Sequence, residues 1–222
     1  MRDRISASAA AGVTASEVTL NELEKRRLAR AAATLNARSR PDLPPLVLMT
    51  DDERLPDPLA AARALPRGSM VVVRARQGAH RAKLAEALQP IARARRLTLL
   101  IANDPVLADR VRAAGVHFSE ANARQAASWR ARRPHWLITV AAHSLRACLA
   151  GRRRRADAVF LGPVFATASH PNGNHFGPLR GRAIALTAPL PSYALGGIAL
   201  APANRLAGSA FVGLAGIAAL AA

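Results

Sequence analysis

The sequence is poor in cysteine, lysine and aromatic residues, and it has no long apolar run. Its single cysteine, Cys148, cannot form an intrachain disulfide, which excludes a disulfide-stapled scaffold and is typical of a reducing compartment. Aromatic residues make up 4% of the chain, so a core must be built from Ala, Leu, Val and Ile. No apolar run reaches the roughly 18–20 residues of a membrane span, and the N-terminal segment lacks the apolar stretch of a secretory signal. We therefore expect a cytoplasmic protein with no membrane partner.

Acidic residues are also scarce. The 222 residues include 32 Lys and Arg against 14 Asp and Glu, a formal net charge of +18, which favours anionic partners. The basic residues recur in short runs at 25–27, 93–96, 130–133 and 152–155, each near the end of an expected helix, where cations complement the helix dipole. No zinc-knuckle, RNA-binding aromatic or helix-turn-helix pattern is present. We interpret the runs as a solvated outer face and expect no specific nucleic-acid partner.

Eight short apolar runs alternate with helix-length segments from residue 46 onward. The runs are 46–50, 70–75, 97–102, 116–118, 136–142, 158–165, 192–198 and 210–216, with helices expected over 79–95, 105–114, 122–133 and 144–154. The runs are continuous rather than alternating, as in strands of a parallel sheet that are buried on both faces. Eight such units predict an α/β fold, a (β/α)8 TIM barrel, with a doubly wound sheet as the alternative.

The two ends of the chain depart from a complete barrel. Residues 1–45 are expected to form a disordered leader, a helix over 17–36 and a proline-rich linker, with the barrel over 46–222. The C-terminal units are somewhat degenerate, because the residues after Ile217 are too few for a normal eighth helix. We hypothesise that the N-terminal helix covers the strands that this leaves exposed.

Polar residues interrupt the apolar runs mainly at their C-terminal ends. In a (β/α)8 barrel these ends form one rim, where the active sites of such enzymes lie. The rim candidates are Asp51, Arg74, Arg76, Asn103, Asp104, Asn122, His143, Thr167, Ser169, His170, Gly196 and Gly197. Asp104 also directly precedes Pro105 and so suits the N-cap of the helix that starts there. His117 lies within an apolar run and Cys148 within a helix, so we interpret both as structural.

Four sequence blocks stand in order at these strand ends. They are IANDPVLADRVRAAGVHF (101–118), VAAHS (140–144), ADAVFLGPVFATASH (156–170) and SYALGGI (192–198). Together they resemble the thiamine phosphate synthase/TenI family over about residues 46–217. The resemblance implies an enzyme of thiamine biosynthesis that couples hydroxymethylpyrimidine diphosphate with thiazole phosphate, giving thiamine phosphate and diphosphate. Its partners would be these small phosphorylated metabolites, and a homo-oligomer is compatible with the fold.

The resemblance also implies roles for individual residues. Arg74 and Arg76 would be catalytic, as cations that bind the leaving diphosphate, and Asn103 would hold substrate. Asp104 and Asn122 would bind Mg²⁺. The remaining candidates fall into two groups: His143 would be catalytic, and the strand-end loop residues Thr167, Ser169, His170, Gly196 and Gly197 would contact substrate.

Several positions depart from the family pattern. Asn122 replaces a carboxylate, His170 replaces a lysine, and Ala141 and Gly216 replace serines. Each change weakens the expected machinery for diphosphate and metal. Two alternatives therefore stay open: a TenI-like thiazole tautomerase that uses His143 as general acid and base and needs no metal, and a non-catalytic thiazole-phosphate binder or regulator.

Overall fold

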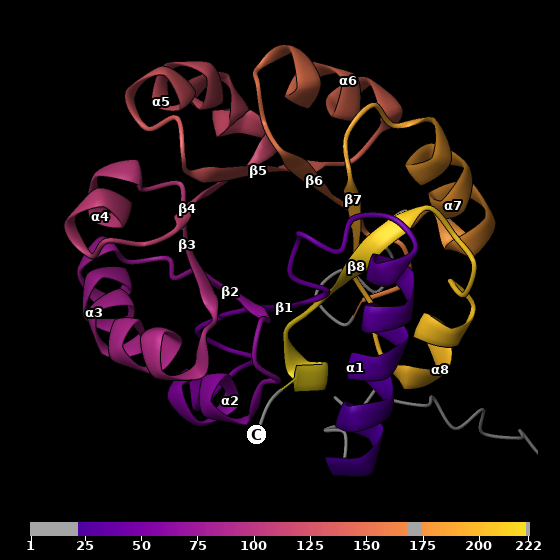
Figure 1. The fold of residues 1–222 in the computed structure, drawn as a ribbon, viewed down its shortest axis with the longest axis horizontal. Helices are drawn as coiled ribbons and strands as arrows, with labels where there is room; N and C mark the ends of the chain where they lie inside the picture. The colour runs from indigo at the N-terminus through magenta and orange to yellow at the C-terminus, as the bar shows by residue number, and fades with distance from the viewer. Residues whose placement is uncertain (1–21, 168–174, 221–222) are drawn as a thin grey trace, which may run out of the picture.

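A computed structural model describes residues 22–167 and 175–220 of the chain. Its eight strands pair in sequence order, every neighbour parallel, and close into a barrel (Figure 1). The strands are β1 (Leu46–Met49), β2 (Met70–Val73), β3 (Thr98–Ala102), β4 (Gly115–Phe118), β5 (Leu137–Ala142), β6 (Ala158–Leu161), β7 (Ser192–Leu195) and β8 (Phe211–Gly216). The predicted (β/α)8 barrel is confirmed, and the doubly wound sheet is excluded. The expected leader over 1–15 lies outside the described residues.

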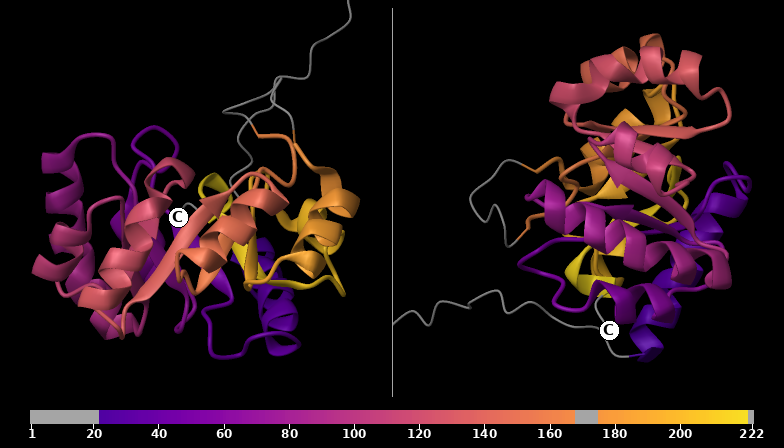
Figure 2. Two further views of the ribbon diagram at one scale, coloured as in Figure 1. Left: turned by 90° about the horizontal axis from the view of Figure 1, so that it is seen from above. Right: turned by 90° about the vertical axis from the view of Figure 1, so that its left-hand side faces the viewer.

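Helices surround the barrel as an outer ring (Figures 1 and 2). They are α1 (Glu22–Ala37), α2 (Pro58–Ala64), α3 (Gly78–Arg95), α4 (Pro105–Arg110), η1 (Glu120–Gln125), α5 (Ala126–Arg132), α6 (Leu145–Arg153), α7 (Gly177–Thr187), α8 (Leu200–Asn204) and η2 (Ala218–Leu220). The segment expected as one helix over 122–133 is split into a 3₁₀ turn and α5. The segment expected over 105–114 stops at Arg110, because Arg112 adopts a left-handed backbone with φ 53°. Within the described residues, no helix is both long and apolar enough to cross a membrane.

The core has two parts, separated by the barrel wall. Outward-facing strand residues pack against the helices, and inward-facing ones fill the barrel with Met70, Phe160 and Tyr193 among them. The rings of Phe160 and Tyr193 lie 5.0 Å apart, and His117 lies 4.6 Å from Phe160. Phe160 and Tyr193 thus supply volume inside the barrel, while the other Phe and Trp residues pack in the layer between strands and helices.

The N-terminal helix α1 packs against β8 and α8, and within the described residues β8 is followed only by the short turn η2 (Figure 1). Leu28, Ala32 and Leu35 form its buried face. At its end the buried Asn36 amide donates to the carbonyls of Arg40 and Leu43, both at 2.8 Å, and of Val212 at 3.1 Å. The helix hypothesised to cover the exposed strands therefore does so, and the described part of it begins at residue 22.

Candidate active site at the strand C-termini

The connection after β1 is acidic and pairs with the predicted arginines. Thr50 is buried, and its hydroxyl both accepts from the Arg74 backbone N–H at 2.8 Å and donates to the Arg74 carbonyl at 3.0 Å. These bonds set the position of Arg74, whose guanidinium pairs with Asp51. Arg76 pairs with Glu53 at 2.8 Å. Both predicted phosphate-binding arginines are thus at the rim and are neutralised by carboxylates.

Asp51 is the centre of this cluster. Its carboxylate accepts from Arg54 at 2.8 Å as well as from Arg74. Partial burial alone would raise the pKa of Asp51, but the hydrogen bonds and charges of the two guanidinium groups outweigh it and hold the pKa well below its ordinary value of 3.8. Asp51 is therefore a fixed anion between two cations at neutral pH.

Asn103 and Asp104 occupy the turn from β3 into α4. Asn103 has a left-handed backbone with φ 55°, and its side-chain oxygen accepts from the Ser119 N–H at 2.8 Å. Asp104 caps α4 by accepting from the Leu107 N–H at 2.9 Å, as its place before Pro105 predicted. The other carboxylate oxygen of Asp104 faces Arg81 at 3.3 Å.

Asn122 lies in η1 after β4 and is linked to Asn103 through one residue. Its amide nitrogen donates to the Ser119 hydroxyl at 3.2 Å, and its oxygen faces Gln125 at 3.5 Å, a marginal contact. Within the described ranges, no three Asp, Glu, His or Cys side chains cluster to hold a metal by themselves. Asp104 and Asn122 would supply one carboxylate and one amide oxygen, so Mg²⁺ there would need water or substrate phosphate oxygens as its further ligands.

His143 follows β5 at the same rim. Its backbone N–H donates to Glu120 at 3.1 Å, and its ring Nδ1 lies 2.5 Å from the Gly162 carbonyl. Because a carbonyl can only accept, Nδ1 carries a proton in this contact, and the neutral ring then presents Nε2 as a base. His143 is exposed, so a ligand at the rim can reach it.

A cavity of about 150 Å³ opens between the ends of β7 and β8. Gly196 and Gly197 form one wall, with φ 93° and 63°. A Cβ on Gly197 would lie 2.3 Å from the Ala166 carbonyl oxygen, so only glycine fits there. Thr167 and Arg54 also line the cavity, and among its described lining residues Arg54 carries the charge. Ser169 and His170, predicted for the neighbouring loop, lie outside the described residues.

The structure adds site residues that the sequence did not single out. Arg54 reaches the cavity from the acidic loop, Arg81 reaches Asp104 from the first turn of α3, and Glu120 holds the backbone of His143. In the sequence, the only signal for these contacts was that the three residues lie near the ends of expected strands. His117 and Cys148 are buried away from solvent, as predicted for structural residues. His117 bonds Thr139 at 2.9 Å, and burial raises the pKa of Cys148 to about 11.

A closed parallel barrel with a polar rim and a glycine-walled cavity after its last two strands defines a (β/α)8 barrel protein with its candidate site at the strand C-termini. The family model described as thiamine monophosphate synthase matches residues 46–221. The chain therefore belongs to the thiamine monophosphate synthase/TenI family.

Individual relatives are distant. A curated protein, putative thiamine-phosphate synthase 2 of Aquifex aeolicus (strain VF5), is 31% identical over 116 residues, which span 52% of this chain and 62% of that protein. The solved thiamine phosphate pyrophosphorylase from Pyrococcus furiosus superposes with a TM-score of 0.64 at 21% identity, covering 80% of this chain and 87% of that one. A putative lyase/mutase from Burkholderia cenocepacia J2315 has a TM-score of 0.53 at 12% identity, covering 88% and 83%. The structural likenesses bear on the fold alone.

Proposed function

We propose that this chain is a divergent thiamine phosphate synthase-like transferase. It would bind thiazole phosphate in the cavity between β7 and β8 and couple it with hydroxymethylpyrimidine diphosphate, giving thiamine phosphate and diphosphate. The cavity carries the proposal: glycines at positive φ bring backbone close to a ligand, and Arg54 supplies a cation at the wall. Loops after strands 7 and 8 are a frequent phosphate site in barrels of this type.

Arg74 and Arg76 would receive the diphosphate. Their present carboxylate partners do not exclude this role, because both guanidinium groups are about half or more exposed, at 47% and 79%. The Arg76–Glu53 pair is exposed on both sides, and such pairs contribute only about 0–1 kcal/mol, so a diphosphate can displace Glu53 at little cost. Asp51 is only 11% exposed and also holds Arg54, so Arg74 would bind the diphosphate while Asp51 stays paired with Arg54. Asn103, held by Ser119, would present its amide to the substrate.

Asp104 and Asn122 would hold Mg²⁺ together with oxygens of the bound diphosphate. When bound, the ion would neutralise charge on the leaving diphosphate. Asp104 must keep its cap on α4 in this role and turn its other oxygen from Arg81 to the ion. Arg81 would then contribute its own charge to the leaving group.

The geometry of His143 supports a second candidate, a thiazole tautomerase. Its Nδ1 is engaged by Gly162, so Nε2 is free to take a proton from one carbon of a bound thiazole and return it to another position. That reaction needs the phosphate cavity and His143 but no diphosphate site. The single carboxylate at the metal position favours it.

One set of assays separates the candidates. Thiazole phosphate binding is measured by calorimetry for the wild type, Arg54→Gln and the control Arg124→Gln, an exposed arginine of the same rim that does not line the cavity. Loss of one charged hydrogen bond, about 1.5–3 kcal/mol, predicts binding that is about 10- to 100-fold weaker in Arg54→Gln alone. No binding by the wild type would refute the proposal.

Coupling and tautomerisation are then measured directly with the purified chain. Thiamine phosphate formed from both substrates with Mg²⁺, and lost in Arg74→Gln, would support the transferase. Binding without coupling, with tautomerisation that is lost in His143→Gln, would support the tautomerase instead. Binding with neither reaction would leave a non-catalytic phosphate binder.

A further inference from the structure

The two ends of the barrel differ sharply in charge. Connections that lead from a helix into the next strand carry nine arginines and two aspartates. These are Arg38, Arg40, Arg67, Arg96, Arg112, Arg133, Arg154, Arg155, Arg205, Asp42 and Asp157. Connections that leave the strands carry six acids and four arginines, namely Asp51, Asp52, Glu53, Asp57, Asp104, Glu120, Arg54, Arg74, Arg76 and Arg124. Among the connections, net positive charge therefore lies at the end opposite the candidate active site, while the helices carry most of the other basic residues.

Six of these arginines are exposed and form no ion pair with any described residue: Arg38, Arg67, Arg96, Arg112, Arg155 and Arg205. Four of them, Arg67, Arg96, Arg112 and Arg155, lie in the connections that enter β2, β3, β4 and β6. We call this set the basic arc. By contrast, the aspartates of the same connections are neutralised, since Asp42 pairs with Arg40 and Asp157 with Arg130. The basic arc thus keeps its full charge.

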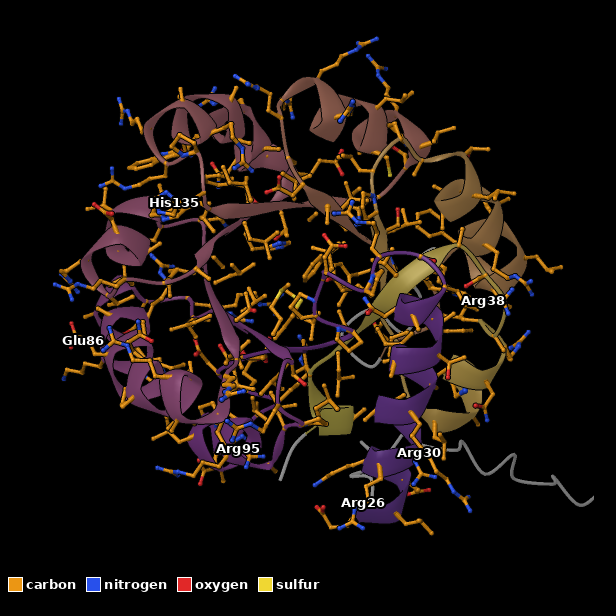
Figure 3. All side chains as sticks on the ribbon, in the orientation of Figure 1. Arg26, Arg30, Arg38, Glu86, Arg95 and His135 are labelled. Carbon is orange, nitrogen blue, oxygen red and sulfur yellow. The ribbon has the colours of Figure 1, made fainter. Side chains whose placement is uncertain are left out.

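Hydrogen bonds connect the neighbouring loops that carry the basic arc. The Gly68 N–H, next to Arg67, donates to the Arg96 carbonyl at 3.1 Å. The Gln89 amide of α3 donates to the Arg112 carbonyl at 2.9 Å. Further along, Arg133 pairs with Asp109 at 2.6 Å, and Arg130 spans from the Trp136 carbonyl to Asp157. These contacts brace the loops that carry the arc, and the loop between Arg112 and Arg155 carries the paired Arg133. Figure 3 shows the nearby Arg95 and His135 around the same barrel.

Three members of the arc stand where backbone conformation favours glycine. Arg96, Arg112 and Arg155 have φ 53°, 53° and 62°. A left-handed residue directly after a helix is usually glycine, because a side chain is strained there. An arginine at such a position carries backbone strain that glycine would avoid. A helix cap alone therefore does not account for these three arginines.

The surface suits phosphate rather than lipid tails. The large exposed apolar side chains of the described residues, Leu23, Val106, Leu145, Leu149, Leu179 and Leu186, all lie on helices, and none lies in a connection that carries the arc. A membrane-binding face would need apolar groups to insert among its cations. Arginine guanidinium groups instead match phosphate oxygens in a bidentate geometry.

We propose that the basic arc binds the phosphate backbone of nucleic acid without reading its sequence. The negative charges spaced along a duplex complement a row of arginines at one end of the barrel. This site is separate from the thiazole phosphate cavity, so the two proposals can fail independently.

The test is binding of a fluorescein-labelled DNA duplex to the full chain, followed by anisotropy at several salt concentrations. The variant carries Arg96→Gly, Arg112→Gly and Arg155→Gly. Glycine suits the left-handed backbone, so the melting temperature should stay equal or rise. Binding should weaken at least about tenfold at 100 mM salt, and the slope of log affinity against log salt should fall by about 3.

The control loses the same charge elsewhere, through Arg26→Gln, Arg30→Gln and Arg146→Gln on exposed positions of α1 and α6. It should retain most of the affinity. Equal losses in both variants would overturn the proposal, because only net charge would then matter. Absence of duplex binding by the wild type, or binding only to phosphatidylserine vesicles, would also overturn it.

Discussion

His117 gives the stability of this protein a pH dependence that one variant can isolate. Its imidazole is buried in the barrel beneath the rim, bonded to Thr139 and tilted against the ring of Phe160. Burial, with a smaller contribution from the charge of Arg74, lowers the pKa of His117 to about 3. The same group in the unfolded chain titrates near 6.5.

The sign and size follow from these two values. Between pH 6.5 and about 3 the unfolded chain binds a proton that the folded protein does not, so acidification favours unfolding. The full stability is present above pH 6.5 and declines as pH falls. At about pH 5 the difference of roughly 1.5 pH units corresponds to about 2 kcal/mol.

Urea unfolding of the wild type and His117→Asn, each at about pH 7.5 and pH 5, measures this quantity. Asparagine can still bond Thr139 but does not titrate, so its cost from the lost ring volume is the same at both pH values. The other titrating groups are shared by the two proteins. The wild type should therefore lose about 2 kcal/mol more than the variant on acidification. Equal pH dependence in the two proteins would show that the imidazole is accessible to protons in the folded state, and would refute the reasoning.

Three further predictions rest on single contacts. Asn36→Leu removes the donor of the Leu43 and Val212 carbonyls, while the Arg40 carbonyl keeps the Leu43 N–H, and it should lower the unfolding free energy by about 3 kcal/mol in urea titrations; a loss under 1 kcal/mol would mean that α1 is not anchored there. Asp104→Asn keeps a good N-cap, so stability should change by less than about 0.5 kcal/mol while any Mg²⁺-dependent turnover falls; unchanged turnover would remove Asp104 from the metal role. Gly197→Ala should weaken thiazole phosphate binding at least about tenfold by calorimetry, because its Cβ would force the cavity wall away from Ala166, and wild-type affinity would contradict the site.

The strands were predictable because burial on both faces requires continuous apolar runs, which are visible without any contact information. The positions at which the strands end were harder to predict. The run over 158–165 gives a strand of only 158–161, since Pro163 has no N–H to continue the ladder. The placement of α1 was inferred from the missing eighth helix, and its contacts with β8 follow from the closed barrel.

The rim residues were predictable as a group, because parallel strands bring all their C-terminal ends to one edge. The ion-pair partners of the rim residues could not be predicted from the sequence. Arg74 and Arg76 were singled out for phosphate, but the sequence does not show that Asp51 and Glu53 neutralise them. Arg54 lies within a loop, where no periodicity relates a side chain to the cavity it lines.

The sequence by itself determined the barrel, the rim on which its chemistry must lie and the family to which it belongs, because these depend on the order of apolar and polar residues along the chain. Only the tertiary structure decided which charges meet. Arg96 and Arg112 lie in connections that enter strands, whereas Asp51 and Glu53 lie in a connection that leaves one. In the closed parallel barrel, these two kinds of connection lie at opposite ends. Ion pairing depends on separations of a few ångströms in space, which only the packed fold sets.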